Sequence, residues 1–166
     1  MDLAQVEALC VAIAKAKRVV VYGCGREALQ IRGFAMRMYH LGLTIGVVGD
    51  MNCPPVEADD LFLATCGPGE LATVSALLGQ ASNAGGKTAV ITAVPKGSAA
   101  KQADMVLTLP AQTMASDQSP EPKSVLPMGS VFEGALFVLF EMMVARLAEI
   151  LAVKPEAMRA RHTNME

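Results

Sequence analysis

Two glycine-containing turns hold the residues of this chain that are best suited to bind a ligand. Residues 23–27 (GCGRE) follow the apolar run 19–22, and residues 66–70 (CGPGE) follow a second apolar run at 61–65. A helix-like segment comes after each turn. Such a turn presents free backbone N–H groups and the positive end of a helix dipole, which together attract anions. The sequence therefore predicts an anion site at the first turn and a similar arrangement at the second.

The elements that must position these turns alternate between strands and helices. Short apolar runs predict strands at residues 18–22, 44–48, 61–65, 88–92 and 105–109. Apolar residues at helical spacing predict helices at residues 3–15, 26–41, 70–84, 98–102 and 130–151. The proline-containing segments 49–60 and 110–127 are predicted connections, and the length of the second is typical of an active-site or interface loop.

This alternation indicates a single α/β domain spanning residues 1–166, with a five-stranded parallel sheet between two layers of helices. A flavodoxin-like strand order, 2-1-3-4-5, places the first and third strands side by side. Because parallel strands end at the same edge of the sheet, this order brings both glycine turns to one crevice.

Composition excludes several classes of function. Hydrophobic residues make up 52% of the chain and aromatic residues only 4%, which suits a parallel sheet covered by helices. The net charge of −2 excludes the electrostatic pattern of a nucleic-acid-binding protein. The longest apolar segment, residues 131–144, is interrupted by Glu133 and Glu141 and is too short to span a membrane. The four cysteines show no C-x-x-C pair, so we expect a cytoplasmic protein with free thiols.

Three stretches resemble a known family of enzymes. The first is the turn at residues 23–26 together with residues 34–42 (FAMRMYHLG). The other two are residues 127–133 (PMGSVFE) and 158–166 (MRARHTNME). In these stretches the chain resembles proteins with a SIS (sugar isomerase) domain, most closely the 6-phospho-3-hexuloisomerases. The resemblance implies a homo-oligomer, either a tetramer or a dimer of dimers, with active sites between subunits. It also implies that the tail 152–166 covers an active site, that the ligand is a sugar or sugar phosphate, and that no metal or cofactor is needed.

The same resemblance implies roles for individual residues. Glu133 stands where the family's catalytic base moves a proton between adjacent sugar carbons, and His162 stands where a tail histidine assists ring opening or covers the site. The predicted substrate-binding residues belong to the two turns: Gly23, Gly25, Arg26, Glu27, Thr65, Cys66, Gly67, Gly69 and Glu70.

The two turns depart from the pattern of the family they resemble. The family's turns usually read Gly-x-Gly-Arg-Ser-Gly and Ser-Gly-Ser-Gly-Glu-Thr, and their hydroxyls hold the phosphate. Here Glu27 replaces the first serine, no hydroxyl remains at residues 66–71, and Pro68 lacks an N–H. One hypothesis is that the Glu27 carboxylate occupies the anion position itself, so that the substrate is neutral or cationic. The alternative is that Glu27 points outward and only complements the helix dipole.

Two other functions fit parts of the sequence. A non-catalytic sensor for a sugar derivative would use the same crevice without turnover. A dinucleotide-binding protein would use Gly23, Gly25 and Ala28 as its fingerprint and Asp50 as the acid near the end of the second strand.

Several single residues have a structural alternative. Cys24 and Cys66 are either reactive thiols at helix N-termini or small buried residues. Glu133 also stands three residues after Ser130, the spacing of a capping box. His40 is expected to be a packed or interfacial residue, because two histidines without ligand spacing do not indicate a metal site.

Overall fold

A five-stranded parallel sheet forms the centre of the computed structural model, which describes residues 1–117 and 124–165. The strands are β1 (Val19–Tyr22), β2 (Ile45–Val47), β3 (Leu61–Thr65), β4 (Lys87–Thr92) and β5 (Met105–Thr108). Their order is β2-β1-β3-β4-β5, with every neighbouring pair parallel, which confirms the predicted topology.

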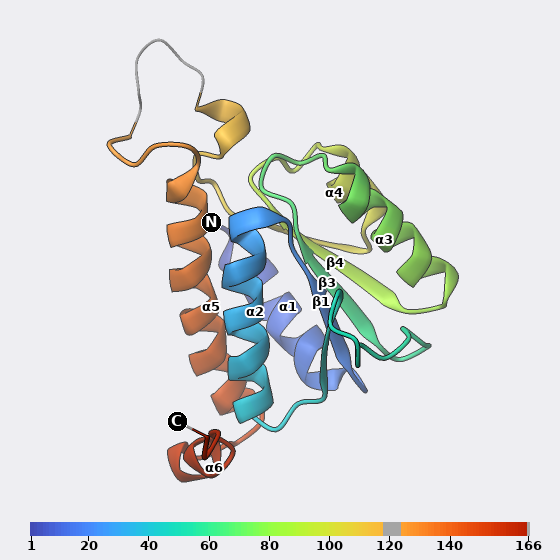
Figure 1. Ribbon diagram of the computed structural model, residues 1–166, viewed down its shortest axis with the longest axis vertical. Helices are drawn as coiled ribbons and strands as arrows, with labels where there is room; N and C mark the ends of the chain where they lie inside the picture. The colour runs from blue at the N-terminus through green and yellow to red at the C-terminus, as the bar shows by residue number, and fades with distance from the viewer. Residues whose placement is uncertain (118–123, 166) are drawn as a thin grey trace.

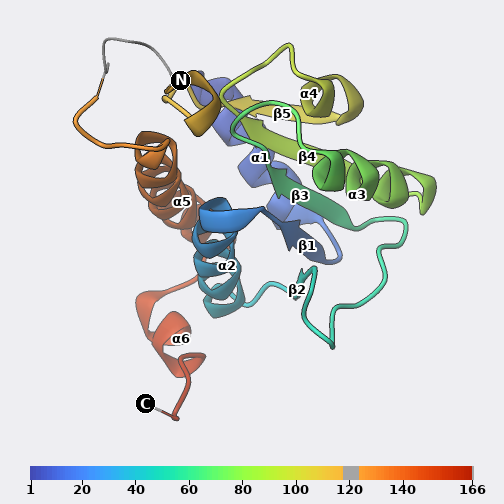
Figure 2. The ribbon, with the colours of Figure 1, turned by 45° about the horizontal axis from the view of Figure 1, so that its top comes forward.

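Helices cover both faces of the sheet, as Figures 1 and 2 show. One face carries α1 (Leu3–Lys15), α2 (Gly25–His40) and α5 (Ser130–Ile150), and the other carries α3 (Ala72–Asn83) and α4 (Ser98–Gln102). A 3₁₀ turn, η1 (Met114–Ser116), and a short helix, α6 (Pro155–Ala160), complete the described elements. Among these, no helix has the length and apolar character needed to cross a membrane.

Alternating strand side chains supply the two hydrophobic cores. In β1, Val19 and Val21 face the core shared with α1, α2 and α5, whereas Val20 faces the core shared with α3 and α4. The first core also stacks Phe34 of α2 on Phe140 of α5, with ring centroids 4.5 Å apart and planes 7° from parallel. The two helices are therefore held side by side along the sheet.

The structure corrects the predicted start of one helix and the predicted N-cap of another. Helix α3 begins at Ala72 rather than at residue 70, because its N-cap, Leu71, is extended. Ser130 is not an N-cap: Gly129 takes that position in a left-handed conformation with φ 77°. The Ser130 hydroxyl instead donates to the Pro127 carbonyl at 2.8 Å, so the predicted capping box with Glu133 is absent.

Two predicted loop regions contain short helical elements. The segment 110–127 contains η1, and its residues 118–123 lie outside the described part of the chain. The tail 152–166 contains α6, which begins with Pro155 at its first position, where a missing N–H costs nothing.

Two methionines provide a matched test of the packing. Met38 is fully buried in the α2 core, whereas Met51 is fully exposed in the loop after β2. We expect Met38→Ala to lower the free energy of unfolding by about 2–5 kcal/mol, because it leaves a cavity. Met51→Ala should change it by less than about 0.5 kcal/mol. Urea unfolding of both variants checks the difference, and equal effects would contradict the assigned core.

Candidate active site

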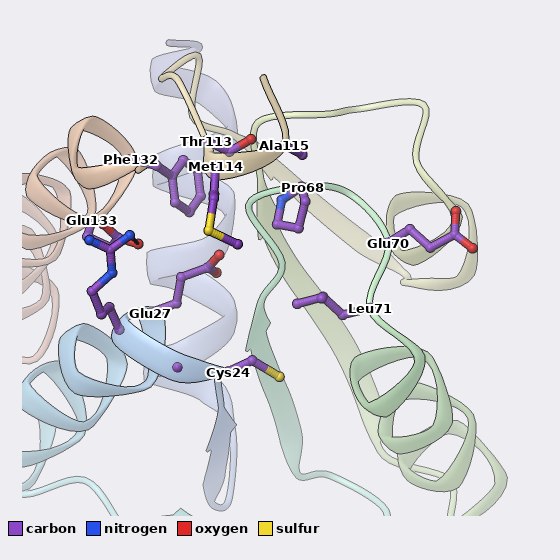
Figure 3. A pocket seen from close by; sticks show the side chains of 13 residues that line it. Cys24, Glu27, Pro68, Glu70, Leu71, Thr113, Met114, Ala115, Phe132 and Glu133 are labelled. Carbon is purple, nitrogen blue, oxygen red and sulfur yellow. Dashed lines mark ion pairs between the residues drawn. The ribbon is translucent and has the colours of Figure 1, made fainter. Parts of the chain in front are cut away.

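The two glycine turns meet at one edge of the sheet, where they form one wall of a pocket of about 600 Å³. Strand β1 pairs directly with β3, with Tyr22 opposite Ala64 at their carboxyl ends. The turns that follow these strands are therefore neighbours. The opposite wall comes from the η1 region and the first turn of α5 (Figure 3). The lining residues are Cys24, Gly25, Arg26, Glu27, Pro68, Glu70, Leu71, Thr113, Met114, Ala115, Gly129, Phe132 and Glu133.

Glu27 connects the first turn of α2 to the turn after β3. Its side chain points into the site (Figure 3), and both carboxyl oxygens lie 3.1 Å from the Gly67 nitrogen, which donates a hydrogen bond to them. Only 9% of Glu27 is exposed. Burial raises the pKa of Glu27, the Gly67 N–H opposes that shift, and the negative charge of Glu133 adds to it. The outward-pointing alternative for Glu27 is therefore wrong.

The chain at Gly67 passes close to the side chains of Glu27 and Phe132. A Cβ atom at this position would lie 2.7 Å from Glu27 Oε1 and 2.9 Å from the Phe132 ring. Both distances are shorter than real Cβ contacts. A side chain at this position would therefore have to displace Glu27 or Phe132.

The turn after β3 has used all of its own backbone donors. The Cys66 N–H donates to the Ile91 carbonyl and the Gly69 N–H donates to the Cys66 carbonyl, both at 2.9 Å. Gly67 donates to Glu27, and Pro68 has no N–H. No donor from Cys66 to Gly69 is left for a ligand.

Arg26 and Glu133 form an ion pair at the other side of the pocket. Arg26 Nη2 lies 3.2 Å from Glu133 Oε1, and the guanidinium also donates to Ser130 Oγ at 3.1 Å and to the Met128 carbonyl. The Glu133 side chain is 16% exposed. Burial raises the pKa of Glu133, and the charge of Arg26 opposes that shift. The start of α5 thus presents a carboxylate with increased proton affinity to the pocket.

The remaining predicted turn residues lie behind this surface or at its rim. Thr65 and Cys66 are buried, and a Cβ at Gly23 would lie 2.7 Å from the Thr65 hydroxyl. Burial raises the pKa of the Cys66 thiol to about 11, so this cysteine is a packed thiol rather than a reactive thiolate. Glu70 stands at the rim with its carboxylate directed away from the cavity (Figure 3).

Part of the pocket wall could not be assigned from sequence. Thr113, Met114 and Ala115 come from the long connection that was expected to border a site, but their spacing carries no chemical pattern. Phe132 and Leu71 are apolar residues next to predicted site residues, and only the fold shows that they face the ligand space.

His162 does not line this pocket within one chain. It lies at the other end of α2, where its ring centroid is 5.4 Å from that of His40. Arg161 fixes this part of the tail by donating to the His40 carbonyl at 3.0 Å. His40 itself is buried, which lowers its pKa, and the charges of His162 and Arg37 lower it further.

Neither a nucleotide site nor a metal site is supported by the geometry. Asp50 forms an ion pair with Arg32 at 2.6 Å and does not line the pocket, so it is not placed for a ribose. Across residues 1–117 and 124–165, no group of three or more His, Cys, Asp or Glu side chains could hold a metal ion.

The buried carboxyl of Glu27 predicts a distinct pH dependence of stability. Its pKa is raised in the folded state, so the wild-type protein loses stability as pH rises from the ordinary glutamate pKa through that raised value. Glu27→Gln should therefore be more stable than the wild type at pH 7, and the gain should shrink toward acid pH, where Glu27 is protonated in both states. Urea midpoints across pH 4–8 check this, with the exposed Glu149→Gln as the control. A pH-independent difference would contradict the assignment.

Comparisons with known proteins agree with this geometry. The family model of the SIS domain matches residues 12–138. The 3-hexulose-6-phosphate isomerase of Mycobacterium gastri is 36% identical over 166 residues, covering 100% of this chain and 82% of its own. The enzyme of the same name from Bacillus subtilis is 32% identical over 155 residues, covering 93% and 83%.

A solved structure supports the same grouping. The crystal structure of a hypothetical protein from Methanococcus jannaschii superposes with a TM-score of 0.87. A molecular function of 3-hexulose-6-phosphate isomerase was inferred for that protein from its structure. It is 27% identical and covers 99% of this chain and 87% of its own. Because the family model matches residues 12–138 and two relatives exceed 30% identity over nearly the whole chain, this protein belongs to the SIS domain family.

Proposed function

We propose that this protein is a sugar isomerase in which Glu133 moves a proton between adjacent carbons of an open-chain sugar. The relatives named 3-hexulose-6-phosphate isomerase support an isomerase reaction. The observation that carries the residue assignment is the Arg26–Glu133 pair, 3.2 Å apart at the wall of the pocket. A carboxylate with a raised pKa is a suitable base, because a base is most effective when its pKa is close to the working pH.

The chemistry requires only groups that line the pocket. The Glu133 carboxylate takes the proton from the carbon next to the carbonyl, and the electron pair of that C–H bond forms an enediolate. The Arg26 guanidinium stabilises the negative oxygen while it exists. The hydroxyl proton of the first carbon then moves to the former carbonyl oxygen, and Glu133 returns its proton to the former carbonyl carbon. The carbonyl is thereby shifted by one position, with no net gain or loss of atoms. No metal or cofactor takes part in these steps.

Deuterium exchange provides the direct test. In deuterated buffer, the enzyme should incorporate deuterium at the carbon next to the carbonyl of its sugar, and NMR detects this without knowledge of the product. Glu133→Gln should reduce the exchange rate by roughly 100-fold or more, because the amide cannot accept the proton.

Glu141→Gln is the matched control, since Glu141 lies on the same helix but pairs with Arg37. It should exchange at the wild-type rate. Saturable sugar binding without exchange in the wild type would instead support the sensor function.

We also infer that the chain assembles through α2 and α5. Helix α2 exposes Leu29 and Met36, and helix α5 exposes Phe137, Val138 and Met142. Apolar exposure of this kind is typical of protein interfaces. A homo-oligomer, either a tetramer or a dimer of dimers, would let the tail of one copy bring its His162 to the pocket of another. The four free cysteines support a cytoplasmic location.

Phe137→Glu should disrupt this assembly, because it places a charge in the proposed apolar interface. Sedimentation equilibrium should show a smaller species than the wild type. Val125→Glu, at an exposed apolar position in the loop before α5, should leave the mass unchanged. A wild-type protein that sediments as a monomer would contradict the proposed interface.

A further inference from the structure

We propose that the substrate of this site is an uncharged sugar without a phosphate, and that Glu27 accepts hydrogen bonds from its hydroxyl groups. This inference rests on the proposed isomerase function and names its substrate class. It is drawn from three features of the pocket: its hydrogen-bond donors, its charges and its walls.

The donors of the turn after β3 are already occupied. A phosphate needs several N–H or O–H donors, because each of its oxygens accepts hydrogen bonds. From Cys66 to Gly69, every N–H that exists donates to a protein oxygen, and the one facing the pocket donates to Glu27. Residues 66–71 also contain no hydroxyl side chain. While Glu27 holds this contact, residues 66–69 offer no N–H to a phosphate.

The charges at the pocket oppose an anion. Among the described lining residues, Glu27 and Glu133 bring carboxyl groups to the pocket, Glu70 turns its carboxylate away, and the one guanidinium is that of Arg26. Arg26 is already paired with Glu133 and bonded to Ser130. A phosphate beside Glu27 would place like charges together in a partly buried space, which is strongly unfavourable.

The same features suit an uncharged sugar. The Glu27 carboxyl group accepts from the Gly67 N–H and interacts with the Thr65 hydroxyl, and its two oxygens keep further acceptor capacity for hydroxyl groups. Pro68, Leu71, Met114 and Phe132 supply apolar surface around it. That surface matches the C–H faces of a sugar, while the carboxyl group orients its hydroxyls.

Calorimetric titration with inorganic phosphate and fructose 6-phosphate tests the proposal without requiring turnover. The wild type should give no saturable heat with either probe up to about 10 mM. Without free donors, the site should bind phosphate too weakly to be saturated at that concentration. Glu27→Ser frees the Gly67 N–H, adds a hydroxyl and removes a negative charge, so it should bind fructose 6-phosphate at least about tenfold more tightly.

Two further variants make the result decisive. Glu27→Gln keeps the side chain over Gly67 without its charge, and should gain phosphate affinity in the same direction even if Glu27→Ser does not fold. Glu149→Ser removes an exposed acid far from the pocket and should behave as the wild type. Micromolar binding of fructose 6-phosphate by the wild type, or no gain in either Glu27 variant, would overturn the proposal.

The deuterium-exchange assay separates this proposal from the proposed function. Exchange with unphosphorylated ketoses that disappears in Glu133→Gln supports both. Exchange confined to phosphorylated ketoses keeps the isomerase function and overturns the substrate class. A protein that exchanges neither class, yet gains phosphate binding in Glu27→Ser, retains the substrate inference and fails as an isomerase.

Discussion

The parallel pairing of β1 with β3 is the constraint on which the site depends. These two strands are separated in sequence by α2, β2 and a long connection, yet Val19 lies opposite Leu61 and Tyr22 opposite Ala64. Their carboxyl ends consequently open at the same place, and the turns after them become neighbours. Without this pairing, Arg26 and Glu27 would face a different strand and the pocket would have no second turn.

Glu27 shows how a fold built to present backbone donors can satisfy them internally. Its carboxyl group reaches the Gly67 N–H from the first turn of α2, and the two turns become connected by one buried contact. Burial is the main cause of the raised pKa of both Glu27 and Glu133, and the charge of Glu133 adds to the shift of Glu27. Arg26 offsets this on the Glu133 side. The pocket therefore holds two acids in different surroundings, an arrangement that suits proton transfer.

Apolar patterning predicted the sheet and its order because each strand is a short buried run that the helices must cover. Predictions failed where local chemistry competed with that pattern. Ser130 has the residue type of an N-cap, but its hydroxyl bonds to Pro127 and Arg26, while Gly129 accepts the left-handed conformation. The direction of Glu27 could not be decided from sequence, because it depends on how closely α2 approaches the turn after β3. His162 was placed by resemblance alone, and in one chain it packs near His40.

The contact at Gly67 constrains some residues of the pocket more than others. On one side, the absence of a side chain at Gly67 sets the spacing of Glu27 and Phe132, so these residues cannot change size independently. On the other side, Met114 and Ala115 are exposed residues of a loop that carries no strand of the sheet. Met114 and Ala115 can therefore vary in size more freely than the residues around Gly67. Differences in sugar preference among proteins that share this acidic turn should accumulate on the loop rather than around the glycines.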